Sequence, residues 1–222
     1  MLDGPMRAPA SGGAPQSMVI FLHGYGSNGD DLIGLAEYWR GVLPDTVFIS
    51  PNAPEICPGA PDGYQWWGLS NLTPGGRAGG VRKPAAGLNA FIDAQLSAYG
   101  LPEARLALVG FSQGTMMALH VGPRRAQALA GIVGYSGMLA DPDELKSEVR
   151  TRPPVLLVHG DADEVLPVAS MPKAKVGLEA AGLDVVTHVS PRLGHSIDER
   201  GLQLGATFLA HRLSRPVVAS GT

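Results

Sequence analysis

The sequence predicts an α/β fold, with a mostly parallel central sheet that helices cover on both faces. Short apolar runs of strand length alternate along the chain with segments whose apolar residues recur at helical spacing, a pattern typical of β-α-β crossover units. These runs are nearly continuous in apolar residues, as expected for parallel strands buried on both faces. With 222 residues, of which 45% are hydrophobic and 17% charged, the chain has enough apolar material for one sizeable core.

The predicted elements divide the chain into an N-terminal arm (1–16), a single domain (17–213) and a C-terminal tail (214–222). The arm is rich in small residues, proline and glycine, with one short edge strand expected near residues 6–8. The predicted strands are 17–23, 46–50, 105–110, 129–136, 154–160 and 184–190. The predicted helices are 30–42, 81–100, 112–121, 142–149, 170–182 and 196–213.

Residues 51–80 show no sustained period and are predicted to form a long loop. The helix that follows is expected to begin in earnest near Pro84, because proline suits the first turn of a helix. The connection between the strands at 129–136 and 154–160 is short, so no separate cap domain is expected.

Charge and cysteine content exclude several classes of protein. The formal net charge is -3, so no basic surplus indicates nucleic acid or an acidic membrane as a partner. Cys57 is the only cysteine, which forbids an intrachain disulfide and favours a reducing compartment. The first residues lack an apolar core of signal-peptide length, and no run of membrane-spanning length occurs. A soluble, cytoplasmic protein is therefore expected.

The strongest local signal is GFSQG at residues 110–114, which matches the pattern G-x-S-x-G. An apolar strand runs directly into the motif and an apolar-faced helix runs out of it. This is the context of a nucleophile elbow, in which a sharp turn lifts a serine hydroxyl above the sheet. Gly110 and Gly114 are expected because side chains there would collide as the strand and helix close. Ser112 is therefore the candidate nucleophile.

A serine hydroxyl needs a base to take its proton, and in such folds the order along the chain is serine, acid, histidine. His195 follows the last predicted strand and every candidate acid. It lies at the carboxyl edge of the sheet, where the ligand sites of open α/β folds gather. The other histidines lie inside elements, near the chain end or at strand ends: His120, His188, His211, His23 and His159.

Three carboxylates in HGDADEVLP compete for the role of the acid: Asp161, Asp163 and Glu164. Asp163 is favoured because it lies further along the loop and can reach a neighbouring loop. Asp161, next to the strand end, is expected to bind loop amides as a local brace. A metal site formed by His159, Asp161 and Asp163 is disfavoured, because their spacing suits no common site.

Five motifs occur together in order: HGYGSNGDDL, QWWGL, GFSQG, HGDADEVLP and GHSI. With these motifs, over roughly residues 18–212, the chain resembles the carboxylesterase and acyl-protein thioesterase family of small α/β-hydrolases. The resemblance implies Ser112 as nucleophile, Asp163 as orienting acid, His195 as base, and the backbone amides of Tyr25 and Gln113 as the oxyanion hole. Thr115 departs from the family pattern, which often has a second glycine there. This difference is expected to affect the pocket wall rather than the chemistry.

The loop at 51–80 is the expected substrate pocket, because its apolar residues lie far from any periodic core pattern. The candidate substrate-binding residues are Trp66, Trp67, Leu69, Met116 and Leu166. One of the two tryptophans is expected to fill the core beneath the loop. Met116 and Met117 face different directions on a helix, so at least one of them belongs to the core. No catalytic part is expected for Cys57, because nothing nearby would lower the pKa of its thiol.

These residues together predict a serine carboxylic-ester hydrolase that acts through an acyl-enzyme on small or medium acyl or aryl esters. Acyl-protein thioesterase or lysophospholipase activity is the alternative. More remote alternatives are an NAD-binding oxidoreductase and a non-catalytic binding protein of the same fold. No cofactor or metal is expected, and exposed aromatic residues in the long loop would suit a weak homodimer.

The NAD alternative comes from residues 24–29, GYGSNG, which match the letters of the dinucleotide fingerprint G-x-G-x-x-G. Asp30 and Asp31 follow at the next predicted helix start, where they would oppose a pyrophosphate. The acid that would bind the ribose is also missing after the second predicted strand. The glycines are instead expected to turn the chain so that the Tyr25 amide faces the carbonyl attacked by Ser112. His23 is expected to hold that turn by hydrogen bonding.

Overall fold

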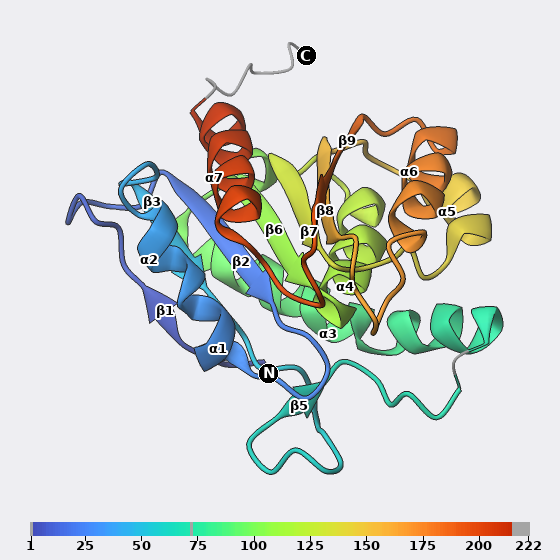
Figure 1. Ribbon diagram of the computed structural model, residues 1–222. Coiled ribbons are helices and arrows are strands. Elements are labelled where there is room, and N and C mark those ends of the chain that lie inside the picture. The colour runs from blue at the N-terminus through green and yellow to red at the C-terminus, as the bar shows by residue number, and fades with distance from the viewer. Residues whose placement is uncertain (1, 72, 215–222) are drawn as a thin grey trace.

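The computed structural model describes residues 2–71 and 73–214, so most of the predicted C-terminal tail lies outside the described residues. Its main sheet has seven strands in the order β1-β3-β2-β6-β7-β8-β9 (Figure 1). The strands are β1 (Met6–Arg7), β2 (Ser17–Leu22), β3 (Thr46–Ile49), β6 (Leu106–Phe111), β7 (Gly131–Tyr135), β8 (Val155–Gly160) and β9 (Val185–Ser190). Within this sheet, β1–β3 is the only antiparallel pairing among the described pairs. The predicted α/β-hydrolase architecture with a mostly parallel sheet is confirmed.

Helices cover both faces of the sheet (Figure 1). They are α1 (Gly29–Ile33), α2 (Leu35–Trp39), α3 (Pro74–Tyr99), α4 (Gln113–Val121), α5 (Pro142–Glu148), α6 (Ser170–Ala180) and α7 (Glu199–Leu213). Apolar residues of α1, α2 and α7 pack in one core cluster, and those of α3 to α6 pack in the other.

Strand β2 shows why its apolar run is continuous. Met18, Ile20 and Leu22 face one core cluster, whereas Val19 and Phe21 face the other, and all five side chains are fully buried. Successive side chains of a strand point to opposite faces, so a strand between two helical layers needs apolar residues at every position.

The register of the parallel strands gathers their carboxyl ends at one edge of the sheet. Leu22 of β2 lies beside Gly110 of β6, which lies beside Gly134 of β7. Gly160 of β8 lies beside Ser190 of β9. The loops that follow these strands therefore lie close together, as ligand sites in such sheets require.

Helix α3 begins at Pro74, so the expected start near Pro84 is wrong. Thr73 caps the helix by accepting a hydrogen bond from Gly76 N at 3.1 Å, and Pro74 occupies the first turn. Tertiary packing stabilises this glycine-rich turn, since Ala78 and Val81 are buried there. Neither this helix nor any other within the described ranges combines the length and the apolarity needed to cross a membrane.

Two further expectations need correction. The segment predicted as one helix at 30–42 forms α1 and α2, which meet at Gly34, a residue type of low helix propensity. The predicted long loop contains a short antiparallel hairpin, β4 (Glu55–Ile56) and β5 (Tyr64–Gln65), before α3 begins.

Candidate active site

Ser112 lies in the sharp turn between β6 and α4. Its backbone has φ 54° and ψ -114°, a conformation that L-residues rarely adopt. A Cβ on Gly110 would lie 2.4 Å from the carbonyl carbon of Gly114, and one on Gly114 would lie 1.8 Å from the Leu22 carbonyl oxygen. Both glycines are therefore required by the closeness of strand and helix, as the motif predicts.

The Thr115 side chain packs against the main chain of β6 and β7 and does not line the cavity that contains Ser112. The expectation that Thr115 affects the wall of the substrate pocket is therefore wrong. The Thr115 hydroxyl lies 2.8 Å from the Gly110 carbonyl oxygen and 2.9 Å from the Tyr135 carbonyl oxygen. The Tyr135 carbonyl also accepts a hydrogen bond from Ser112 N at 2.9 Å. The side chain is buried, and it fills the space left by Gly134 and Gly137.

His195 and Asp163 come together across two neighbouring loops. His195 Nδ1 lies 2.8 Å from Asp163 Oδ2. Because the carboxylate can only accept, Nδ1 carries the proton and Nε2 of the neutral ring is left as a base. The ring packs against Phe111, with centroids 4.9 Å apart, and keeps 18% of its side chain exposed toward solvent. Both Ser112 and His195 line one cavity, although no hydrogen bond joins them among the described contacts.

The Asp163 carboxylate is fully buried and held on both oxygens. Oδ1 accepts hydrogen bonds from the amides of Val165 and Leu166 at 2.9 and 2.8 Å. Oδ2 lies 3.2 Å from His159 Nε2, which also lies 2.8 Å from the Leu166 carbonyl oxygen. Burial alone would raise the pKa of Asp163, but the His195 hydrogen bond and the amides together hold it below its ordinary value.

Asp161 binds a loop amide, as expected from the sequence. Its carboxylate accepts a hydrogen bond from the Arg192 amide, at a residue with φ 58°. This contact fixes the loop between β9 and α7, which carries His195. Within residues 2–71 and 73–214, no group of three metal-ligating side chains is close enough to hold an ion.

The backbone amides of Tyr25 and Gln113 have no intramolecular acceptor among the described hydrogen bonds. Gln113 is the first residue of α4, where backbone amides lack partners within the helix. Tyr25 lies in the glycine-rich loop after β2, and both residues line the same cavity as Ser112. A Cβ on Gly24 would lie 3.3 Å from Ser112 Cβ, which shows how closely this loop approaches the nucleophile.

The glycine-rich loop is fixed by contacts of its own. Gly26 has φ 75°, and its amide donates to the Tyr64 carbonyl at 2.9 Å. A Cβ on Gly29 would lie 2.1 Å from the Ser50 carbonyl oxygen, so α1 starts directly against the end of β3. The Gly29 amide donates to Asn52 Oδ1 at 2.8 Å. The Gly29 amide lies at the start of α1, where the pyrophosphate of a dinucleotide would bind, and it already has an acceptor.

His23 holds the turn before this loop as a neutral ring. Its Nε2 accepts a hydrogen bond from the Ala53 amide at 2.9 Å, so Nδ1 carries the proton and donates to the Gly24 carbonyl at 2.7 Å. Burial lowers the pKa of His23, and the Gly24 hydrogen bond and Asp31 oppose this only in part.

The Gln113 side chain connects the turn at Ser112 to the loop that contains Trp66 and Trp67. Its Oε1 accepts from the Trp66 amide and its Nε2 donates to the Trp67 carbonyl, both at 2.9 Å. Trp66 is fully buried, and its indole donates to the His23 carbonyl at 3.0 Å. Trp67 is also buried, so the expectation of exposed aromatic residues in this loop is wrong for both tryptophans.

A cavity of about 380 Å³ opens at Ser112 and His195. Its apolar lining residues are Trp67, Leu69, Met116, Met138, Val165 and Leu166. Trp66 does not line it, so the expected substrate contact of Trp66 does not fit this geometry. Met116 faces the cavity and Met117 is fully buried in the core, as their adjacent helical positions require.

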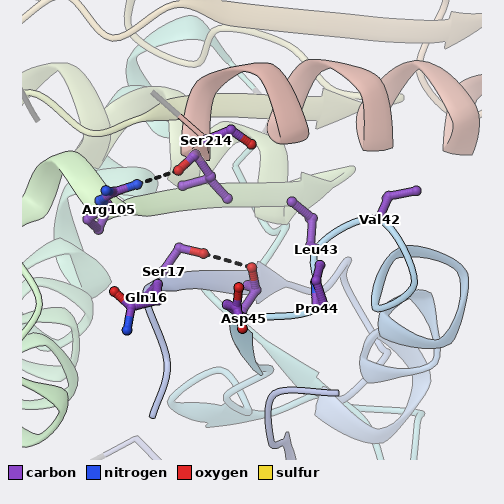
Figure 2. A pocket seen from close by; sticks show the side chains of 10 residues that line it. Gln16, Ser17, Val42, Leu43, Pro44, Asp45, Arg105 and Ser214 are labelled. Carbon is purple, nitrogen blue, oxygen red and sulfur yellow. Dashed lines mark hydrogen bonds between the residues drawn. The ribbon is translucent and has the colours of Figure 1, made fainter. Parts of the chain in front are cut away.

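A second cavity, of about 250 Å³, lies at the opposite end of the sheet, where β2, β3 and β6 begin (Figure 2). Ser17 and Thr46 share a 2.7 Å hydrogen bond there, and Arg105 donates to the Leu213 carbonyl. None of the described residues that line it is a histidine or a cysteine. The Ser17 and Thr46 hydroxyls therefore have no histidine among the described lining residues to activate them as nucleophiles.

Comparison with known proteins places the chain among ester hydrolases. The family model described as phospholipase/carboxylesterase matches residues 8–213. The chain belongs to this family. Acyl-protein thioesterase 1 of Schizosaccharomyces pombe is 34% identical over 171 residues, covering 73% of this chain and 75% of that protein. Esterase YpfH of Escherichia coli strain K12 is 26% identical over 200 residues, covering 90% of this chain and 84% of that protein.

The crystal structure of esterase PE8 is similar over nearly the whole chain. It has a TM-score of 0.91 and 42% sequence identity, and the match covers 96% of this chain and 99% of that one. Membership of the phospholipase/carboxylesterase family confirms the predicted resemblance, and the protein is an ester-hydrolysing enzyme.

Several contacts of the site were not predicted from the sequence. His159, named above only as a strand-end histidine and a disfavoured metal ligand, contacts Asp163, and Arg77, Met138 and Val165 line the cavity. For His159 a signal existed, because it lies four residues before Asp163 at a strand end. Arg77 and Met138 lie in segments without a motif, so only the packing of α3 and of the segment after β7 brings them to the cavity.

Proposed function

We propose that this family member is a serine carboxylesterase with Ser112 as nucleophile, His195 as general base and Asp163 as the residue that orients the base. The observation that carries this proposal is the cavity that Ser112 and His195 share, with Asp163 holding His195 by Nδ1. The fold-specific turn at Ser112 and the buried, doubly held carboxylate both fit these roles.

In the proposed reaction, Ser112 Oγ attacks the ester carbonyl while His195 Nε2 takes the hydroxyl proton. The tetrahedral intermediate collapses, the carbon–oxygen bond to the alcohol breaks, and His195 returns the proton to the leaving alkoxide. Water then attacks the acyl-enzyme with the same proton transfers and releases the acid. Asp163 keeps Nδ1 protonated throughout and stabilises the imidazolium.

The amides of Tyr25 and Gln113 are proposed to bind the oxyanion. Backbone donors held in place before the reaction stabilise the charge that develops on the carbonyl oxygen. The side chain of Gln113 is hydrogen-bonded to the Trp66 amide and the Trp67 carbonyl. These contacts hold the residue in place and so help to fix the direction of its backbone N–H.

The cavity supports small or medium acyl or aryl esters as substrates. Its volume of about 380 Å³ lies at the small end of ligand pockets, and its lining is largely apolar. Acyl-protein thioesterase or lysophospholipase activity is the alternative. A series of 4-nitrophenyl esters and matched thioesters separates the two, since a thioesterase would favour the thioester at long acyl lengths.

Labelling by a fluorophosphonate tests the catalytic proposal directly. The wild-type protein is expected to form one covalent adduct, which peptide mapping places on Ser112, and Ser112→Ala is expected to form none. A folded wild-type protein that is not labelled would support the non-catalytic binding protein instead. Saturable binding of NADH, followed by the fluorescence of its reduced nicotinamide, would support the oxidoreductase.

We also propose a cytoplasmic location, because a chain with Cys57 as its only cysteine gains no intrachain disulfide from an oxidising compartment. Cell fractionation with antibody detection tests this, and recovery in a membrane or secreted fraction would contradict it.

A further inference from the structure

His159 lies next to the proposed acid but outside the catalytic cavity. It is near the end of β8, where it pairs in register with Val189 of β9, and it is only 1% exposed. The described residues that line the cavity do not include it. A substrate bound in the cavity therefore does not meet this ring, and His159 can affect the reaction only through its neighbours.

The Nε2 atom of His159 faces two oxygen atoms. It lies 2.8 Å from the Leu166 carbonyl oxygen and 3.2 Å from Asp163 Oδ2. Carbonyl and carboxylate oxygens only accept hydrogen bonds, so Nε2 carries a hydrogen. A second ring N–H group therefore lies beside the carboxylate oxygen that His195 Nδ1 contacts at 2.8 Å.

The two oxygens of Asp163 are held by different parts of the chain. Oδ1 accepts from the amides of Val165 and Leu166, which belong to the same loop as Asp163 itself. Oδ2 contacts His195 and His159. His195 lies in the loop between β9 and α7, whereas His159 lies in β8, so among the described contacts only His159 ties Oδ2 directly to a strand of the sheet.

The same ring also holds the loop after Asp163. The Leu166 carbonyl oxygen accepts from His159, and the Leu166 amide donates to Asp163 Oδ1 at 2.8 Å. Residues 161–167 lie outside any helix or strand, so no regular backbone pairing fixes this loop. His159 thus connects β8 to the acid by two routes, one at Oδ2 and one through the peptide groups of Leu166.

We propose that His159 is a positioning residue of the catalytic centre, which anchors Asp163 to β8 so that His195 keeps its direction toward Ser112. A catalytic group works best when a residue of a rigid element supports it, and a small misplacement lowers the rate of the chemical step. This inference rests on the proposed function and adds a residue that acts on His195 only through Asp163.

Three replacements of His159 test the role of its N–H group. His159→Leu removes the donor and is expected to lower kcat for 4-nitrophenyl butyrate on the order of 10- to 100-fold, as for a lost hydrogen bond to a charged group. KM is expected to change little, because the amides of Val165 and Leu166 remain bonded to Asp163. His159→Gln offers an N–H group near the position of Nε2 and should recover most of kcat. His159→Asn is too short and should behave like His159→Leu.

His120→Leu is the matched control, because it removes another buried histidine that contacts an aspartate. His120 Nδ1 lies 2.8 Å from Asp141 Oδ2, and neither residue lines the catalytic cavity. This variant is expected to lower the free energy of unfolding, measured in urea, and to keep kcat close to that of the wild type. Loss of a buried histidine is in this way separated from loss of the anchor.

A double-mutant cycle with Asp163→Asn tests whether His159 acts through the acid. With Asp163→Asn the carboxylate is already absent, so adding His159→Leu is expected to lower kcat little further. Replacements of residues that act through one contact are not additive. A role in packing alone would lower kcat by the same factor in both backgrounds.

The outcomes separate this inference from the proposed function. The inference is wrong if His159→Leu raises KM and leaves kcat unchanged, if His159→Gln is no more active than His159→Asn, or if the double-mutant cycle is additive. The comparison of His159→Gln with His159→Asn still applies if His159→Leu does not fold. In each of these cases, fluorophosphonate labelling of wild-type Ser112 upholds the serine esterase. Absence of both labelling and aryl-ester hydrolysis in the wild type would overturn the proposed function itself.

Discussion

Two histidine–aspartate pairs in this molecule share the same contact and differ in their surroundings. His195 Nδ1 lies 2.8 Å from Asp163 Oδ2, and His120 Nδ1 lies 2.8 Å from Asp141 Oδ2. The first pair borders the catalytic cavity, whereas the second is buried where α4 ends and α5 begins. The contact alone therefore does not identify a catalytic pair.

The difference lies in what else holds the carboxylate. Arg124 contacts the same oxygen of Asp141 at 2.6 Å and continues the network to Glu148 at 2.7 Å. No arginine or lysine pairs with Asp163 among the described ion pairs, and backbone amides hold its other oxygen. The charge of Asp141 is balanced by Arg124, while in the proposed mechanism that of Asp163 stabilises a protonated His195. In the proposed mechanism, the His195–Asp163 pair suits catalysis because backbone amides orient Asp163 and because His195 shares a cavity with the proposed nucleophile Ser112.

Replacing each histidine by alanine gives the largest expected contrast. His195→Ala is expected to lower kcat on the order of 10⁶-fold, as for loss of a triad histidine. His120→Ala is expected to keep kcat close to that of the wild type and to lower the free energy of unfolding by about 1–3 kcal/mol, because a buried donor is lost. Aryl-ester kinetics and urea unfolding measure the two effects. A folded His120→Ala protein as inactive as His195→Ala would contradict the distinction.

The aspartates provide the next contrast. Asp163→Asn is expected to lower kcat on the order of 10⁴-fold, because the amide no longer keeps the proton on Nδ1 of His195. Asp141→Asn is expected to lower stability by about 3 kcal/mol with kcat nearly retained, since it weakens a buried ion pair with Arg124. Steady-state kinetics and urea unfolding report these changes. Near-full activity of Asp163→Asn with a loss in Asp161→Asn would show that Asp161 is the acid.

Thr115 tests how far the geometry at Ser112 depends on its support. Thr115→Val keeps the shape of the side chain and removes the hydroxyl that lies against the Gly110 and Tyr135 carbonyls. We expect kcat to fall about tenfold with KM unchanged, because a misplaced nucleophile affects the chemical step more than binding. The rate of fluorophosphonate labelling should fall in parallel. Thr115→Ser keeps the hydroxyl and removes only the methyl group. If its kcat is as low as that of Thr115→Val, the effect comes from packing and not from the hydroxyl.

The smallest expected effect concerns His23, a buried histidine whose ring nitrogens are hydrogen-bonded to the main chain and not to a carboxylate. Burial lowers its pKa below 6.5, so the unfolded chain binds a proton more readily than the folded protein does. The His23 contribution to stability is therefore present above pH 6.5 and is lost as the pH falls toward its folded pKa. Urea unfolding of the wild type and His23→Gln across this range measures it. The difference between the two proteins should shrink as the pH falls, and a constant difference would contradict the assignment.

Residues that follow local patterns could be predicted from the sequence. The apolar runs located six strands of the main sheet, and the chain order of motifs selected Ser112, Asp163 and His195, which the structure brings to one edge. Strand order and the closeness of loops follow from the register of parallel strands, so these residues meet even though 83 positions separate Ser112 from His195.

Features that depend on tertiary contacts could not be predicted. The first turns of α3 contain several glycines, and the packing of Ala78 and Val81 stabilises them in place of helix propensity. The burial of both tryptophans depends on Gln113 and His23, which come from distant segments. Thr115 lies next to a recognised motif, yet its support for β6 and β7 is visible only once the two strands are paired.

The two hydrogen bonds of the Gln113 side chain contact only main-chain atoms of the neighbouring loop, the Trp66 amide and the Trp67 carbonyl. The side chain at position 67 can therefore change without removing either hydrogen bond. Mutation or directed evolution could reshape the pocket there while the oxyanion donor keeps its direction. In the proposed mechanism, the indole of Trp67 would set specificity while its main-chain carbonyl helps to hold Gln113, so that new substrates could be gained without rebuilding the catalytic centre.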